Sequence, residues 1–201
     1  MLQWTSYSCE RASPVLSRSA LSLMSLALVI AACSSSHAGA GELNEAHLTD
    51  VNITVKYPSD WYLAEQSLTP NLGNPHEVLS VGSFPLNSGG PNCAQIPSQA
   101  LGEMTATDVF VTVQERGADA IPAGFAPRPD EFGPIPGSTQ NELYECVDEA
   151  ERADIDAIHW IWFRDQDRFF HVAVAIGEDA APEDVAAAWK VLDDLIIEPT
   201  P

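Results

Sequence analysis

Hydrophobic and polar residues alternate in several short segments between residues 51 and 176. Strict alternation puts every second side chain on one face, which predicts half-buried β-strands. In residues 108–115, for example, Val109, Val111 and Val113 share one face. The segments that we predict to be strands are 51–57, 77–84, 108–115, 141–147, 158–164 and 168–176. The last two are expected to form a hairpin across Asp165-Gln166-Asp167.

Two segments have the pattern of a helix. Residues 97–104 are predicted to form a short helix with Pro97 in its first turn, where a missing N–H is tolerated. Residues 182–197 carry apolar side chains at helical spacing, begin with acidic residues and precede Pro199, which stops a helix. Strands followed by a closing helix predict an α+β domain, with a mainly antiparallel β-sheet packed by a short helix and a C-terminal helix.

The segment 117–137 has five prolines and four glycines, which predicts a long irregular loop. Its candidate partner-binding residues are Phe125, Arg128, Phe132 and Ile135. Under this interpretation, Phe125→Asp or Phe132→Asp should abolish binding and leave the fold intact. The alternative is that these side chains fold back over one face of the sheet, and the sequence does not decide between the two. Trp160 and Trp162 share a strand face, which is more typical of a core than of a ligand platform.

The N-terminal residues have the layout of a secretory signal peptide. Arg11 and Arg18 precede an apolar run over residues 20–32, which ends with Ala31 and Ala32. A membrane-spanning helix needs about 20 apolar residues, and this run is shorter. The residues after Cys33 are mostly serine, glycine and alanine, which is typical of a flexible tether.

The sequence Ile30-Ala31-Ala32-Cys33 resembles the bacterial lipobox, in which an aliphatic residue and two small ones precede the acylated cysteine. The resemblance implies cleavage before Cys33 and a lipid anchor on that residue, at the extracytoplasmic face of the cell membrane. The expected organisation is a signal peptide over 1–32, a lipidated N-terminus and tether over 33–50, and a single domain over 51–198.

The chain contains four cysteines. Cys9 would leave with the signal peptide and Cys33 would take lipid, so Cys93 and Cys146 remain. In an oxidising compartment, two remaining cysteines predict one disulfide, worth about 4 kcal/mol for a loop of this length. The alternative is a free reactive thiol.

The formal net charge is −20, from 29 acidic and 9 basic residues. An acidic surface repels phosphate backbones, so nucleic-acid binding is not expected. The acidity is instead consistent with solubility outside the cell.

Three segments carry a family resemblance: Tyr57-Pro58-Ser59-Asp60-Trp61, the late hairpin, and the closing run from Ala188 to Leu195. Together they resemble the PsbP-like fold, and also small lipoproteins of Gram-positive bacteria. The resemblance implies an antiparallel sheet between helices, and binding or scaffolding at a membrane complex without catalysis. No functional residue of the family can be carried over to this chain.

The sequence has no nucleophile motif, no phosphate-binding glycine loop and no histidine pair with the spacing of a helical metal site. His159 and His171, on the two arms of the predicted hairpin, are the only pair that we would test for catalysis. The acidic run over 148–156 lacks the spacing of a calcium loop. We therefore expect a non-enzymatic lipoprotein that binds a protein partner at the membrane surface, with no cofactor and no metal. The alternative is a module that binds a small ligand or a divalent metal ion.

Overall fold

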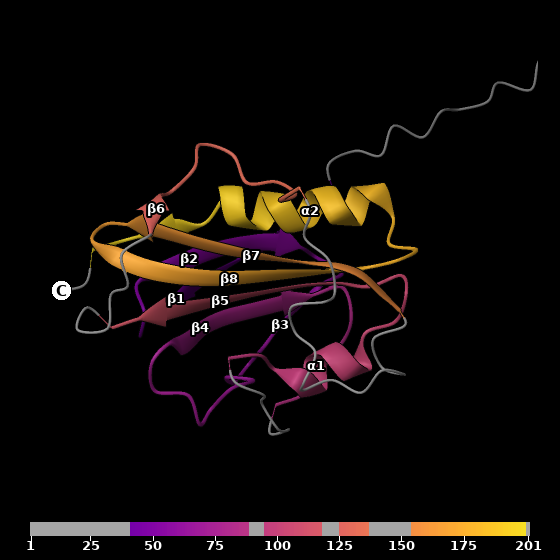
Figure 1. Ribbon diagram of the computed structural model, residues 1–201, viewed down its shortest axis with the longest axis horizontal. Coiled ribbons are helices and arrows are strands. Elements are labelled where there is room, and N and C mark those ends of the chain that lie inside the picture. The colour runs from indigo at the N-terminus through magenta and orange to yellow at the C-terminus, as the bar shows by residue number, and fades with distance from the viewer. Residues whose placement is uncertain (1–40, 89–94, 118–124, 137–153, 200–201) are drawn as a thin grey trace, which may run out of the picture. The chain divides into compact units, whose positions relative to one another are not determined.

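The computed structural model describes residues 41–88, 95–117, 125–136 and 154–199. It confirms an α+β domain with mostly antiparallel strands: a six-stranded sheet of order β3-β4-β5-β8-β7-β6 and a three-stranded sheet of order β1-β2-β9 (Figure 1). In the described residues, only the pairing of β6 with β7 is parallel. The elements are β1 (Leu43–Leu48), β2 (Ile53–Pro58), β3 (Tyr62–Leu63), β4 (His76–Gly82), α1 (Ser98–Glu103), β5 (Val109–Arg116), β6 (Ala126–Pro127), β7 (Ile155–Asp165), β8 (Arg168–Gly177), α2 (Pro182–Asp193) and β9 (Ile196–Ile197).

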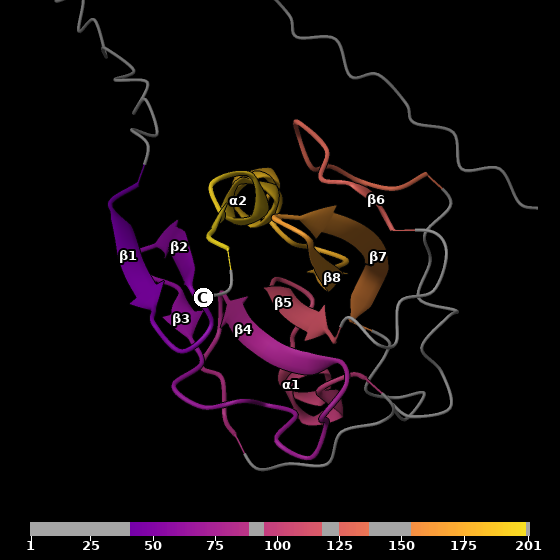
Figure 2. The ribbon, with the colours of Figure 1, turned by 90° about the vertical axis from the view of Figure 1, so that its left-hand side faces the viewer.

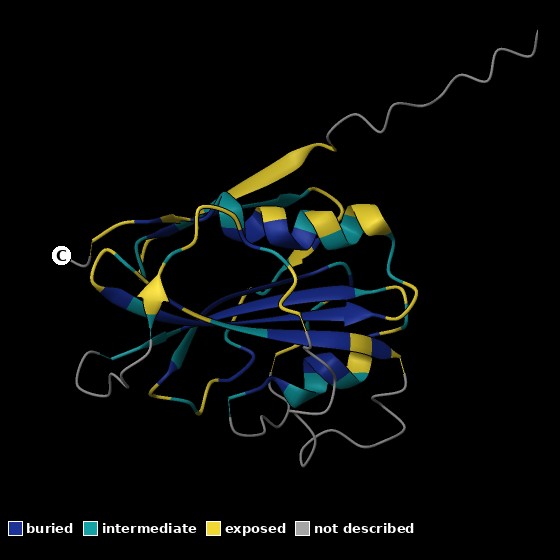
Figure 3. Ribbon diagram, turned by 45° about the horizontal axis from the view of Figure 1, so that its top comes forward, coloured by how far each residue is buried: buried dark blue, intermediate teal, exposed yellow. Residues whose placement is uncertain are grey.

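The six-stranded sheet lies between the two helices (Figure 2). The alternating residues of β5 separate as their pattern predicts: Val111 packs into the cluster that contains α2, and Phe110 into the cluster that contains α1. We call the two faces the α2 side and the α1 side of the sheet. β2 also contributes to the α2-side cluster, through Ile53 and Val55. On the α2 side, Figure 3 shows exposed residues along β1 and on the face of α2 that points away from the sheet.

The predicted hairpin is present, but its turn is one residue shorter than expected. Asp165 pairs with Arg168, so the connection is the two-residue loop Gln166-Asp167. Both residues have positive φ, 50° and 60°, as the tight hairpin turns that match the twist of a sheet require. The register of the hairpin is therefore shifted by one residue from the one that a three-residue turn would give.

Two predicted boundaries were wrong. Residues 43–48, assigned to the tether, form β1 and pair with β2, so the folded domain begins before residue 51. The C-terminal helix ends at Asp193, and Ile196–Ile197 leave it to pair with β2 as β9. The pairing buries Ile197 to 6% exposure and leaves Ile196 half exposed, as expected for a strand rather than a helical stripe.

Several predictions lie outside the described residues. These are the signal peptide, the lipid site Cys33, the strand over 141–147, and the cysteines Cys93 and Cys146. In the described ranges, neither helix is long and apolar enough to cross a membrane.

Candidate functional site

Residues 125–136, which we call the edge segment, contain all four candidate partner-binding residues. Arg128 anchors this segment to the end of α2: its guanidinium group donates to the carbonyl oxygens of Leu192, at 2.7 Å, and Leu195, at 2.7 Å. It also donates to the Asp193 carbonyl and pairs with the Asp165 carboxylate, both at 3.1 Å. The last carbonyls of a helix lack intrahelical partners and carry negative partial charge, so Arg128 acts as a C-terminal cap.

Phe132 belongs to the core. Its side chain is 5% exposed and contacts Phe163 edge to face, with ring centroids 5.3 Å apart. Its backbone N–H donates to the Asp193 carboxylate at 2.8 Å. For Arg128 and Phe132, the alternative interpretation is therefore the correct one: they fold back over the sheet and the helix. The burial of this side chain argues against the expectation that Phe132→Asp leaves the fold intact.

Phe125 and Ile135 lie at the two ends of the edge segment. Ile135 is 38% exposed, and its backbone N–H donates to Nδ1 of His159 at 3.1 Å. Phe125 lies on the α1 side, where its ring stacks on His171 at 5.4 Å and meets Phe169 edge to face at 5.4 Å. Of the four candidates, only these two are placed to meet a partner.

Beside Phe125 lies a cluster of aromatic rings that no sequence motif marks as a site. We call Phe125, Trp160, Trp162, Phe169 and His171 the aromatic patch. The two tryptophan rings are nearly parallel, at 20°, with centroids 6.4 Å apart, and Trp162 contacts His171 at 5.7 Å. Trp162 is 46% exposed, so the expectation that both tryptophans belong to the core was wrong for Trp162.

Two buried polar atoms in the same row of side chains as the patch have no hydrogen-bond partner among the described residues. Gln114, His171 and Trp162 are cross-strand neighbours on β5, β8 and β7. Nδ1 of His171 contacts the carbonyl oxygen of the Gln95 side chain at 3.0 Å, so Nδ1 carries the proton and Nε2 is an acceptor. Among the described residues, Nε2 of His171 and Oε1 of Gln114 are buried with no hydrogen-bond partner. A buried acceptor without a donor costs about 1–3 kcal/mol, so a donor at either atom would be favoured.

His159 and His171 do not form a pair. In the hairpin register, Trp162 is opposite His171, whereas His159 is opposite Val174. His159 therefore lies on the α2 side, with its ring 5.2 Å from that of Trp189, and His171 lies on the α1 side. Burial lowers the pKa of His159, partly offset by the charge of Asp156. Burial and the charge of Arg116 lower the pKa of His171 to about 4.

The low pKa of His171 predicts a pH-dependent stability. The pKa of this histidine is about 6.5 in the unfolded chain and is lowered to about 4 in the folded domain. The unfolded state therefore binds more protons between these values, and the free energy of unfolding should fall as pH is lowered through this window. We expect a loss on the order of 2 kcal/mol, since each unit of pKa difference corresponds to ~1.4 kcal/mol and polar neighbours screen part of it.

Urea denaturation of wild type and His171→Gln, measured from pH 7 to pH 4.5, checks this expectation. The variant should lose less stability than wild type over the window, and His47→Gln, which changes an exposed histidine, should behave like wild type. Parallel curves for all three proteins would contradict the assignment to His171.

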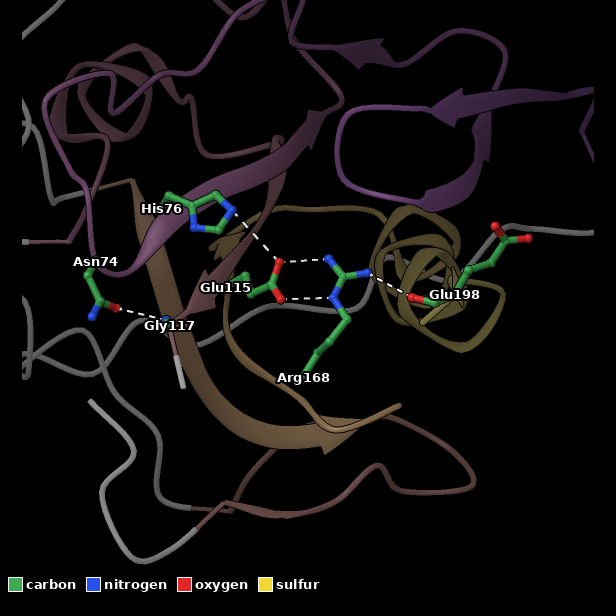
Figure 4. Close-up of polar contacts among 6 residues, drawn as sticks. All are labelled: Asn74, His76, Glu115, Gly117, Arg168 and Glu198. Atoms are coloured by element: carbon green, nitrogen blue, oxygen red, sulfur yellow. Dashed lines mark hydrogen bonds and ion pairs between the residues drawn. The ribbon is translucent and has the colours of Figure 1, made fainter. Parts of the chain in front are cut away.

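A second polar cluster lies on the α2 side, where the six-stranded sheet meets the C-terminal segment (Figure 4). The guanidinium group of Arg168, 5% exposed, pairs bidentately with the carboxylate of Glu115 at 2.8 and 2.6 Å. It also donates to the Glu198 carbonyl at 3.1 Å, and Nε2 of His76 lies 3.7 Å from Glu115. These contacts link β5 and β8 to the chain that follows β9, so we assign the cluster to stability. It borders a groove of about 470 Å³ that is also lined by Arg116 and Phe169.

The described residues contain no group of three or more His, Cys, Asp or Glu side chains that could hold a metal ion. Most of the acidic run over 148–156 lies outside them. The chemistry that remains is that of a binding surface: exposed rings, buried acceptors and nearby arginines.

Comparisons with known proteins offer no precedent for this surface, because no family model, no curated protein and no solved structure matches the chain.

Proposed function

We propose that this protein is a lipid-anchored, non-enzymatic binding domain at the extracytoplasmic face of the cell membrane. The proposal rests on the lipobox-like sequence Ile30-Ala31-Ala32-Cys33 at the end of a signal-peptide pattern. Cleavage there would make Cys33 the acylated N-terminus. Since β1 begins at Leu43, a short tether would then hold the domain near the membrane surface.

The aromatic patch supports the assignment as a binding domain. Exposed large rings are a feature of interfaces, and Trp162 is exposed although it lies in the middle of a well-paired strand. The protein partner expected from the sequence would contact Phe125 and Ile135, because Arg128 and Phe132 are committed to the fold. The buried acceptors of His171 and Gln114 favour the second candidate function, small-ligand binding.

We propose that the domain is not catalytic because of where its two candidate histidines lie. His159 and His171 lie on opposite sides of the sheet, so they cannot act together on one substrate. A PsbP-like fold is also part of the proposal: α1 and α2 pack on opposite sides of an antiparallel sheet, as that resemblance implies.

The experiment that tests the anchor is Cys33→Ala in the full-length chain, expressed in a bacterium that acylates lipoproteins. We expect wild type in the membrane fraction and labelled by a palmitate analogue, and the variant unlabelled. Cys9→Ala is the matched control, because Cys9 lies in the segment that would be removed, and it should behave like wild type. A Cys33→Ala protein that is still labelled and membrane-bound would refute the lipid anchor.

A further inference from the structure

We propose that the aromatic patch binds an anionic saccharide, a pyranose unit that carries a carboxylate or phosphate group. This inference rests on the proposed binding function and specifies its ligand. It combines three observations at the same end of the α1 side: an exposed tryptophan surface, buried hydrogen-bond acceptors, and two arginines with no carboxylate partner among the described residues.

The tryptophans provide a stacking surface. Trp160 and Trp162 lie nearly parallel along β7, and Trp162 is 46% exposed. The C–H-rich face of a pyranose ring packs on an indole face by dispersion and by the attraction of polarised C–H groups to the π-system. α1 spans only Ser98–Glu103, and its cluster includes Trp160 as a partly buried member but not Trp162. The exposed part of the surface therefore lies beyond the helix.

The buried acceptors fit hydroxyl groups. Nε2 of His171 and Oε1 of Gln114 both accept hydrogen bonds, and neither has a donor among the described residues. The His171 ring contacts Phe125 and Trp162, and Gln114 is its cross-strand neighbour, so both acceptors belong to the same row of side chains as the exposed tryptophan. A hydrocarbon ligand would leave them unsatisfied, whereas a sugar carries several donors at the edge of an otherwise apolar ring.

The arginines supply the charge preference. Among the described cations, Lys56, Arg128, Arg168 and Lys190 each form an ion pair with a carboxylate. Arg116 and Arg164 have no such partner within the described ranges.

These two arginines flank the aromatic patch. Each is the cross-strand neighbour of Phe169, on β5 and β7, and strand alternation places both on the α1 side. Two inter-strand spacings put their backbones about 10 Å apart, similar to the length of a disaccharide. Arg116 also acts electrostatically on His171, which places its charge near the acceptors. In a chain of net charge −20, two arginines with no carboxylate partner in the described part of the chain favour an anionic group on the ligand.

The test is a glycan microarray with uronate-containing, phosphorylated and neutral saccharides, probed with the lipidated mature protein in detergent. Affinities for one hit and its neutral analogue are then measured by calorimetry. We expect binding to uronate-containing or phosphorylated glycans and no binding to neutral ones. Comparison of the uronate-containing set with the phosphorylated set shows which anion is preferred. Trp162→Ala should weaken binding at least tenfold, and Arg116→Gln with Arg164→Gln should abolish the preference for the charged analogue.

Matched controls are Tyr62→Ala, an exposed ring at the opposite edge of the sheet, and Lys190→Gln, an exposed cation on α2. Both should bind like wild type. The inference is overturned if no saccharide binds at millimolar concentration, or if Trp162→Ala binds as well as wild type. Acylation of Cys33 tests the proposed function separately. A protein that binds no saccharide but is acylated at Cys33 is still a lipid-anchored domain, with a different ligand.

Discussion

Phe132→Asp is expected to lower the free energy of unfolding by more than ~5 kcal/mol, which is most of the stability of a typical domain. Removing a buried phenylalanine ring costs about 3–5 kcal/mol. The new carboxylate would also be buried, next to the Asp193 carboxylate that accepts the backbone N–H of residue 132. Two adjacent carboxylates repel each other, so the edge segment should detach from α2 or the domain should unfold.

Circular dichroism during urea denaturation measures this loss. Ile135→Asp is the matched control, because Ile135 lies on the same segment but is 38% exposed, and it should cost less than about 1 kcal/mol. Equal stability of Phe132→Asp and wild type would mean that the edge segment does not pack as described. A loss of partner binding in Phe132→Asp therefore cannot be interpreted as a contact, whereas a loss in Ile135→Asp can.

The strands and helices were predictable because alternation and helical spacing are local properties. Residues 108–115 were predicted to be a strand with Val109, Val111 and Val113 on one face, and β5 has that face on the α2 side. β1 and β9 were not predicted because they depend on non-local contacts: each pairs with β2. Residues 43–48 are mostly exposed, and their pattern alone resembles a tether.

The histidine pair shows how one residue of turn length decides a candidate site. A three-residue turn over Asp165-Gln166-Asp167 would place residues of equal parity on the same face, and His159 with His171. The observed two-residue turn reverses that relation, because a shift of one residue moves every side chain to the other face. Composition does not fix the turn length: Asp167 tolerates the positive φ that the shorter turn needs, but Gln166, which also has positive φ, gives no such signal.

The aromatic patch could be predicted only in part. The sequence places Trp160 and Trp162 on one face of a strand, but it does not show whether another element covers that face. Coverage depends on where α1 lies, and α1 is six residues long, too short to cover the whole sheet. The row of Gln114, His171 and Trp162 comes from three strands and follows from sheet order and register, which are non-local.

Arg168→Met should destabilise the domain by about 3–5 kcal/mol, because it leaves the carboxylate of Glu115 without its bidentate partner. Glu115 is 16% exposed, so water cannot fully replace the guanidinium group. His76 lies 3.7 Å away with 44% exposure, and it cannot reproduce two parallel hydrogen bonds. The Glu198 carbonyl loses a donor as well, which should loosen the segment after β9.

A double variant separates the stabilisation by the ion pair from the destabilisation by a buried charge that has lost its partner. Glu115→Leu combined with Arg168→Met removes both charges and should recover most of the lost stability, since a buried pair is often replaceable by apolar side chains. Lys56→Met breaks the exposed pair with Glu45, at 3.3 Å, and should cost under about 1 kcal/mol. If Arg168→Met were no more costly than Lys56→Met, the Glu115–Arg168 pair would not be what links the six-stranded sheet to the C-terminal segment. A large loss restored in the double variant would show that burial of the charge, rather than the ion pair itself, makes Arg168 indispensable.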